Sequence, residues 1–111
     1  MIRPATEADL AALVALEETF PAVDRFDRRT WRRLLAGQTL ALVHETGGGI
    51  DASAVLLFRQ GSDLARLYSI SVAPTSRGRG LGSQMLAACE DHARKRGAAR
   101  MRLEVRSTNS S

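Results

Sequence analysis

The chain has 111 residues, of which 44% are hydrophobic and 25% are charged. This composition is typical of one small globular domain and excludes a disordered or fibrous protein. No run approaches the roughly 20 apolar residues of a membrane span, and Glu7 and Asp9 follow the N-terminus too closely for a secretory signal. We therefore expect a single soluble domain over residues 1–111, located in the cytoplasm and away from membranes.

Sixteen lysines and arginines outnumber twelve acidic residues, which gives a net charge of +4. The basic residues are spread from Arg3 to Arg106 and do not form a dense basic tail. No motif of a nucleic-acid-binding domain accompanies them, so we expect no nucleic-acid partner. Anionic small molecules fit this charge equally well.

Cysteine and histidine are scarce. Cys89 is the only cysteine, which excludes an intramolecular disulfide, and its place in a helical pattern favours a buried inert thiol over a nucleophile. His44 and His92 have no second histidine or cysteine at ligand spacing, so the sequence predicts no metal site. His44 falls inside a strand-like run, which favours a packed or surface histidine over a catalytic one.

A short strand and a helix are predicted at the N-terminus. Residues 1–4 suit an edge strand. Thr6 can cap a helix whose apolar residues follow helical spacing and whose first turn carries acidic residues, where the helix dipole favours them. Pro21 would end this helix.

A second helix, rich in arginine, is predicted next. Asp27 can cap it, Phe26 and Trp31 are spaced as a hydrophobic staple, and Gly37 can end it. The arginines of "RRTWRRLL" could form a phosphate-binding face, but the pattern favours a solvated helix face.

Three strand-like runs follow, at residues 39–45, 53–60 and 64–72. Glycines and an aspartate at 47–51 separate the first two runs, which predicts a hairpin with a loose loop. Pro74 lacks the backbone N–H that a ladder needs, so the third strand should end shortly before it.

A helix and a further strand complete the predicted order. The helix carries an apolar residue at every fourth position, and this stripe consists of Leu81, Met85, Cys89 and Ala93. Gly97 can end the helix, and residues 100–107 alternate in polarity as a strand does. The sequence thus predicts an α/β (α+β) domain in the order β-α-α-β-β-β-α-β.

The run "RGRGLG" at residues 77–82 lies between a strand and a helix. Such a turn points backbone N–H groups of a helix N-terminus at an anion, and Arg77 and Arg79 can pair with phosphate oxygens. The Rossmann fingerprint fails because Ser83 stands where a glycine is needed, and the P-loop motif is not met. The glycines alone fit a polar turn with a helix cap equally well.

The spacing of this turn, between "LYSISVAP" and an amphipathic helix, resembles the Q/R-x-x-G-x-G/A signature of the GNAT superfamily of N-acetyltransferases. The resemblance runs from "IRPATEADL" to "LEVRSTN" and implies a mixed, mostly antiparallel GNAT-like sheet with acetyl-CoA as acetyl donor. In that family the turn binds the pyrophosphate, and the end of the preceding strand binds the pantetheine arm. By position, the pyrophosphate would contact Arg77, Gly78, Arg79, Gly80, Leu81, Gly82 and Ser83, and the pantetheine would contact Ile70, Ser71 and Val72.

Acetyl transfer needs a deprotonated amine, so a base must remove a proton at neutral pH. The resemblance implies Glu104 as this base, because it matches the base position of the ribosomal-protein N-terminal alanine acetyltransferases, whose strand also reads as an LEVR-type motif. A glutamate flanked by Arg102 and Arg106 on a solvated strand face is the other interpretation. The family further suggests the N–H of Val72 as donor to the carbonyl oxygen, and Asn109 as a cofactor contact.

The sequence also departs from the family. Members normally continue with a helix that bears a tyrosine, often the general acid, and with two more strands. We therefore expect a domain truncated before that helix and those strands, or a second subunit that supplies the missing wall. Tyr68 is the only tyrosine and does not occupy the position of that acid. Asp51-Ala52-Ser53 replaces the Gly-x-Ala/Gly that is frequent in the third strand.

Two functions therefore stay open. The first is acetyl transfer from acetyl-CoA to a primary amine, of a peptide N-terminus or a small molecule, by direct attack. The second is a non-catalytic CoA-binding or interaction module. If residues 100–107 form an open sheet edge with Met101, Leu103 and Val105 poorly covered, we expect a two-fold homodimer through this strand and little activity of the chain alone.

Overall fold

The computed structural model describes residues 1–19, 26–36, 39–47, 49–59 and 61–103. Its strands are β1 (Ile2–Pro4), β2 (Thr39–Thr46), β3 (Gly49–Phe58), β4 (Leu64–Val72) and β5 (Arg100–Leu103). Its α-helices are α1 (Leu10–Glu17), α2 (Arg28–Ala36) and α3 (Leu81–Lys95). None of the helices in this described part is long and apolar enough to cross a membrane.

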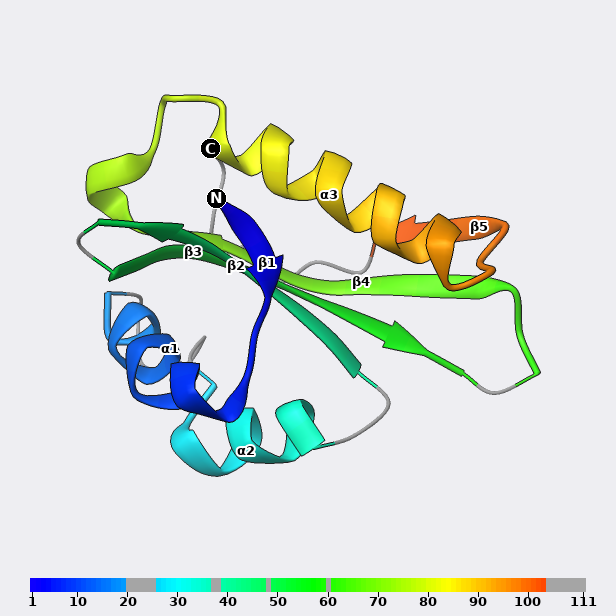
Figure 1. Cartoon of the computed structure of the whole chain (residues 1–111), viewed down its shortest axis with the longest axis horizontal. Helices are drawn as coiled ribbons and strands as arrows, with labels where there is room; N and C mark the ends of the chain where they lie inside the picture. The colour runs from blue at the N-terminus through cyan, green and yellow to red at the C-terminus, as the bar shows by residue number, and fades with distance from the viewer. Residues whose placement is uncertain (20–25, 37–38, 48, 60, 104–111) are drawn as a thin grey trace.

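The strands form one sheet in the order β1-β2-β3-β4-β5. Neighbouring strands are antiparallel except β4 and β5, which are parallel. Helices α1 and α2 cover one face of the sheet and α3 covers the other (Figure 1). The predicted element order and the mixed, mostly antiparallel sheet are therefore confirmed.

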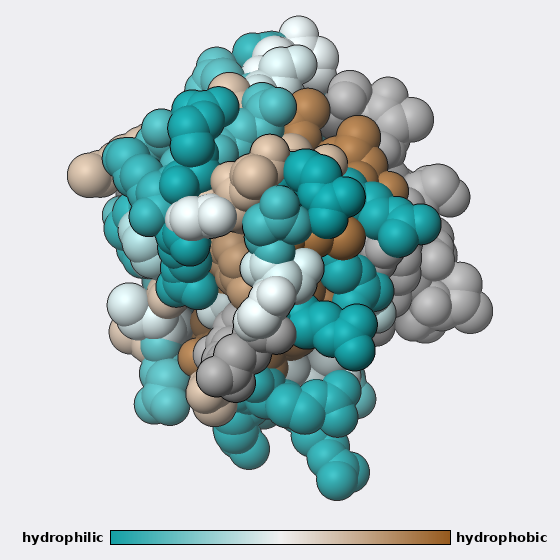
Figure 2. Space-filling view, turned by 90° about the vertical axis from the view of Figure 1, so that its right-hand side faces the viewer, coloured by the Kyte–Doolittle hydropathy of each residue, from teal (hydrophilic) through white to brown (hydrophobic). Residues whose placement is uncertain are grey.

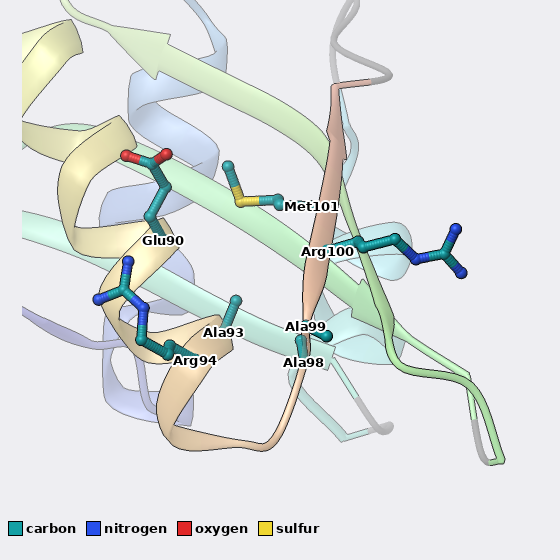
Figure 3. A pocket seen from close by; sticks show the side chains of 7 residues that line it. All are labelled: Glu90, Ala93, Arg94, Ala98, Ala99, Arg100 and Met101. Atoms are coloured by element: carbon teal, nitrogen blue, oxygen red, sulfur yellow. The ribbon is translucent and has the colours of Figure 1, made fainter.

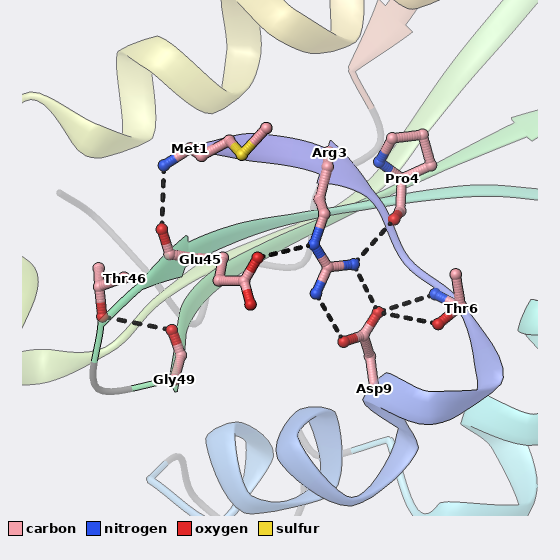
Figure 4. Close-up of polar contacts among 8 residues, drawn as sticks. All are labelled: Met1, Arg3, Pro4, Thr6, Asp9, Glu45, Thr46 and Gly49. Atoms are coloured by element: carbon pink, nitrogen blue, oxygen red, sulfur yellow. Dashed lines mark hydrogen bonds and ion pairs between the residues drawn. The ribbon is translucent and has the colours of Figure 1, made fainter.

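The predicted N-terminal helix begins with a short 3-10 turn, η1 (Glu7–Asp9), and continues as α1. The Asp9 carboxylate accepts the backbone N–H of Thr6 at 2.8 Å and both Nη groups of Arg3 at 2.9 Å. Arg3 also donates from Nε to Glu45 on β2, at 3.0 Å (Figure 4). This network ties the edge strand β1 to the start of α1 and to β2.

The cap and staple predicted for α2 are confirmed. The Asp27 carboxylate accepts the backbone N–H of Thr30 at 2.8 Å, which holds the pKa of that carboxyl below its usual value. The rings of Phe26 and Trp31 meet edge to face, with centroids 5.4 Å apart. The arginines of α2 are exposed, whereas Trp31 is buried.

The predicted hairpin is present, but its loop is shorter than expected. β3 begins at Gly49 and not at residue 53, because Thr46 pairs directly with Gly49. Gly49 has a φ of +125°, which lets the chain reverse at once. The polar Asp51 therefore lies within a strand, where its side chain finds partners on neighbouring segments.

The core is divided by the sheet. On the α3 side, the predicted stripe of Leu81, Met85, Cys89 and Ala93 is buried against β3 and β4. On the other side, Leu13 of α1 and Trp31 of α2 pack on Val43 and Val55. The predicted burial of Cys89 is confirmed, and this burial raises the pKa of its thiol to about 12. A thiol with so high a pKa is a poor nucleophile at neutral pH.

The last described strand, β5, lies beside β4 at one end of the sheet order. Met101 is half-buried under α3, whereas Leu103 is 60% exposed. Figure 2 shows apolar side chains between polar ones on this side of the molecule. Val105 lies outside the described residues, and self-association through β5 stays a prediction.

We predict that Asp9→Asn lowers the free energy of unfolding by about 1–2 kcal/mol at neutral pH, because it removes a charge-assisted, bidentate contact with Arg3. The hydrogen bonds from Arg3 hold the pKa of the Asp9 carboxyl below its usual value. The ionised form therefore adds stability above the unfolded pKa of about 4, and this stability is lost as the pH falls through the lower, folded pKa.

Urea denaturation of the parent and of Asp9→Asn at a series of pH values measures this difference, which should shrink below about pH 4. Asp91→Asn is the matched control, because the Asp91 carboxylate pairs with Lys95 on an exposed face of α3. The prediction is contradicted if the difference in the free energy of unfolding between the parent and Asp9→Asn stays constant down to acid pH.

Candidate active site

The predicted anion-binding turn lies between the end of β4 and the start of α3. A short 3-10 turn, η3 (Pro74–Ser76), follows β4, and α3 begins at Leu81. Gly78 and Gly80 have φ values of +81° and +75°, in the left-handed region that favours glycine. A Cβ atom at either position would meet nothing within 4 Å, so the glycines are required by the backbone conformation and their outer side is open.

The electrostatics of this turn suit an anion. The first N–H groups of a helix have no acceptor within the helix and carry the positive end of its dipole. Gly80 is the N-cap of α3, which points these groups toward the turn. Arg77 and Arg79 are exposed, and the Nε of Arg77 donates to the carbonyl of Val72 at 3.2 Å. The turn thus combines backbone donors with two guanidinium groups.

The structure brings most of the predicted site residues together. Ile70, Ser71 and Val72 form the last stretch of β4, and residues 77–83 form the turn and the first residues of α3. Ser71 and Val72 are buried, whereas Arg77, Gly78, Arg79 and Gly80 are exposed. Glu104 and Asn109 lie outside the described residues.

β4 carries a bulge just before the predicted pantetheine residues. Leu67 pairs with Leu56 and Ser69 pairs with Val55, so Tyr68 is an extra residue on β4. The ring of Tyr68 stacks on Phe26, with centroids 5.7 Å apart and planes 9° apart. The bulge therefore brings β4 against the segment that leads into α2.

A buried carboxylate that sequence reasoning missed supports the same segment. Glu17, at the end of α1, is 2% exposed and accepts the backbone N–H of Phe26 at 3.0 Å. It shares the buried face of α1 with Leu13 and Leu16. A glutamate at an apolar position of the helical pattern was the signal that could have identified it.

A second missed residue is Asp51 of β3, which contacts the η3 turn that follows β4. Its carboxylate contacts the Nδ1 of His44 at 2.6 Å and accepts the hydroxyl of Ser76 at 3.0 Å. Its backbone carbonyl accepts the N–H of Ala73 at 2.8 Å. Asp51 and Ser76 line a hollow of about 480 Å³ that Arg79 also lines.

A smaller hollow of about 150 Å³ lies at the opposite end of α3. Figure 3 shows Glu90, Ala93 and Arg94 of α3 on one side of it, and Met101 of β5 pointing toward them. The side chain of Arg100 points away from the helix (Figure 3) and pairs with Asp63. The length of α3 separates this hollow from the anion-binding turn, so it does not belong to the candidate site.

A strand, a glycine-rich turn and a helix N-terminus thus form an anion-binding element inside a mixed α+β domain. This is the arrangement that the GNAT resemblance implies. A model of the acetyltransferase (GNAT) family matches residues 8–111. The chain belongs to this family of acetyltransferases. Enzymes of the family use acetyl-CoA and an amine substrate.

Solved structures of acetyltransferases resemble this chain. The ribosomal-protein-S18-alanine N-acetyltransferase from Escherichia coli is 28% identical, with a TM-score of 0.84 over 99% of this chain and 69% of that chain. The ribosomal-protein-alanine N-acetyltransferase from Brucella melitensis is 29% identical, with a TM-score of 0.73 over 88% of this chain and 69% of that chain.

A more distant structure shares the fold alone. An aminoglycoside acetyltransferase from an uncultured soil metagenomic sample is 20% identical, with a TM-score of 0.74 over 96% of this chain and 78% of that chain. No curated protein matches this sequence.

Proposed function

We propose that this chain transfers the acetyl group of acetyl-CoA to the N-terminal amine of a protein or peptide. The observation that carries the proposal is the open, left-handed glycine turn between β4 and α3, with Arg77 and Arg79 beside it. The two relatives at 28% and 29% identity are both named for acetylation of alanine in ribosomal proteins, which favours a peptide N-terminus as acceptor.

The turn would hold the pyrophosphate of acetyl-CoA. Its glycines leave no side chain between the phosphates and the backbone, so the first N–H groups of α3 can donate directly. Arg77 and Arg79 add donors that match phosphate oxygens. The pantetheine arm would follow Ile70, Ser71 and Val72 toward the bulge of β4.

Glu104 would act as the general base. It is the next residue after Leu103, which pairs with Leu67 in the parallel ladder of β5 and β4. Its carboxylate would take the proton from the attacking ammonium group, directly or through a water molecule, so that the amine can form a C–N bond with the thioester carbonyl. The thioester C–S bond then breaks, and CoA leaves as a thiolate that takes up a proton to give the free thiol. The N–H of Val72 would stabilise the negative charge that develops on the carbonyl oxygen.

We predict that Gly80→Val abolishes measurable binding of CoA. The substitution places a β-branched side chain on the open side of the turn and disfavours its left-handed backbone. Gly61→Val is a matched control, because Gly61 has a φ of +81° and equally open surroundings but lies in the turn before β4. It should lose stability without losing CoA affinity.

Calorimetric titration of both variants with CoA tests the prediction, and Arg77→Ala should weaken binding in a salt-dependent way. Unchanged CoA affinity in Gly80→Val would remove the turn from the proposed site.

We predict that Glu104→Gln lowers turnover by roughly 10²–10⁴-fold at neutral pH while CoA affinity is kept, because the amide cannot accept the proton. Activity should recover in part at high pH, where the acceptor amine deprotonates on its own. The assay is release of the CoA thiol with an alanine-initiated peptide as acceptor.

Equal activity of parent and Glu104→Gln across the pH range would exclude Glu104 as the base. If the parent binds CoA but turns over no peptide or small-molecule amine, the chain is a CoA-binding module and the proposed reaction is wrong.

A further inference from the structure

We propose that Asp51 is a positioning residue for the CoA-binding turn, which it holds through the hydroxyl of Ser76. The inference rests on the proposed function, because it concerns the same turn. Asp51 does not contact the turn glycines. It acts through the residue that immediately precedes Arg77.

Asp51 of β3 holds both ends of the short η3 turn. Its backbone carbonyl accepts the N–H of Ala73, before η3, at 2.8 Å. Its carboxylate Oδ2 accepts the hydroxyl of Ser76, the last residue of η3, at 3.0 Å. A single residue of the sheet therefore fixes the segment that connects β4 to the glycine turn.

The other carboxylate oxygen of Asp51 is held from the neighbouring strand. His44 of β2 contacts Oδ1 through its Nδ1 at 2.6 Å, and both side chains are 19% exposed. This contact orients the carboxylate so that Oδ2 faces Ser76. Hydrogen bonds to a partly buried carboxylate are stronger than those between neutral groups, so this orientation is well defined.

Asp51 differs in its surroundings from the two residues that follow it in β3. Ala52 and Ser53 are fully buried, whereas Asp51 reaches the hollow that Ser76 and Arg79 also line. The partners of the Asp51 carboxylate, His44 and Ser76, both lie outside its own strand.

Positioning and simple electrostatics predict opposite effects of removing this carboxylate. A negative charge near the pyrophosphate opposes binding, so Asp51→Ala should strengthen CoA binding if charge alone matters. If Asp51 positions the turn, the same substitution frees Ser76 and weakens binding. The sign of the change therefore separates the two explanations.

Calorimetric titration with CoA tests the inference on the parent, Asp51→Ala, Ser76→Ala and the double variant. We expect the Kd to rise about tenfold in each single variant. The double variant should bind CoA no more weakly than Asp51→Ala, because the two substitutions remove the same hydrogen bond. Asp51→Asn should bind nearly as the parent does, because its amide oxygen can still accept the Ser76 hydroxyl.

Asp63→Ala is the matched control, because it removes an aspartate that pairs with Arg100 on the surface before β4. It should leave the Kd for CoA unchanged. In turnover assays Asp51→Ala should raise KM for acetyl-CoA while kcat is kept, which a loss of overall stability would not produce.

The outcomes are distinct. Tenfold weakening by Asp51→Ala and Ser76→Ala, without additivity and with rescue by Asp51→Asn, supports the inference. If the parent binds CoA and both single variants bind as tightly or more tightly, the inference alone is overturned. If the parent does not bind CoA, the proposed function fails and this inference fails with it. If Asp51→Ala does not fold, Ser76→Ala decides, since it removes only a hydroxyl group.

Discussion

The packing of α3 on the sheet is the contact on which the candidate site depends. Leu81 and Met85, in the first turns of α3, lie in the same buried cluster as Val72 at the end of β4. The end of the strand and the start of the helix are therefore held against one core. The chain between them must turn sharply, and Gly78 and Gly80 allow this in left-handed conformations. The helix N-terminus thus has a fixed place beside β4.

The opposite face of the sheet supports the site in a different way. The bulge at Tyr68 places an extra residue in β4, and the ring of Tyr68 stacks on Phe26. Glu17 binds the backbone of Phe26 from the end of α1. An unpartnered buried carboxylate is costly, so this hydrogen bond is a strong constraint on the entry to α2. β4 is consequently anchored from both layers of helices.

Much of this architecture could be predicted because it depends on local patterns. The apolar stripe of α3, the Asp27 cap and the extent of β4 all follow from residues close together in the sequence. The bulge of β4 and the role of Asp51 could not be predicted, because each depends on pairing between segments that are distant in sequence, which no local spacing specifies. The start of β3 and the partner of Glu17 depend on nearer contacts, of Thr46 with Gly49 and of Glu17 with Phe26, which the polar loop pattern and the helical pattern do not specify.

The two carboxylates that sequence reasoning missed have a common physical role. Glu17 and Asp51 each accept a hydrogen bond from a connecting segment, Glu17 from the residue before the N-cap of α2 and Asp51 from the end of η3. A loop held only by its own turn residues can adopt several conformations, and ordering it on binding costs free energy. A carboxyl acceptor on a helix or strand that is already packed reduces this cost, because the cost of burying the acceptor is compensated only when the loop donates its hydrogen bond. Glu17 thus favours one conformation of the segment that leads into α2, and Asp51 favours one conformation of the segment that leads into the glycine turn.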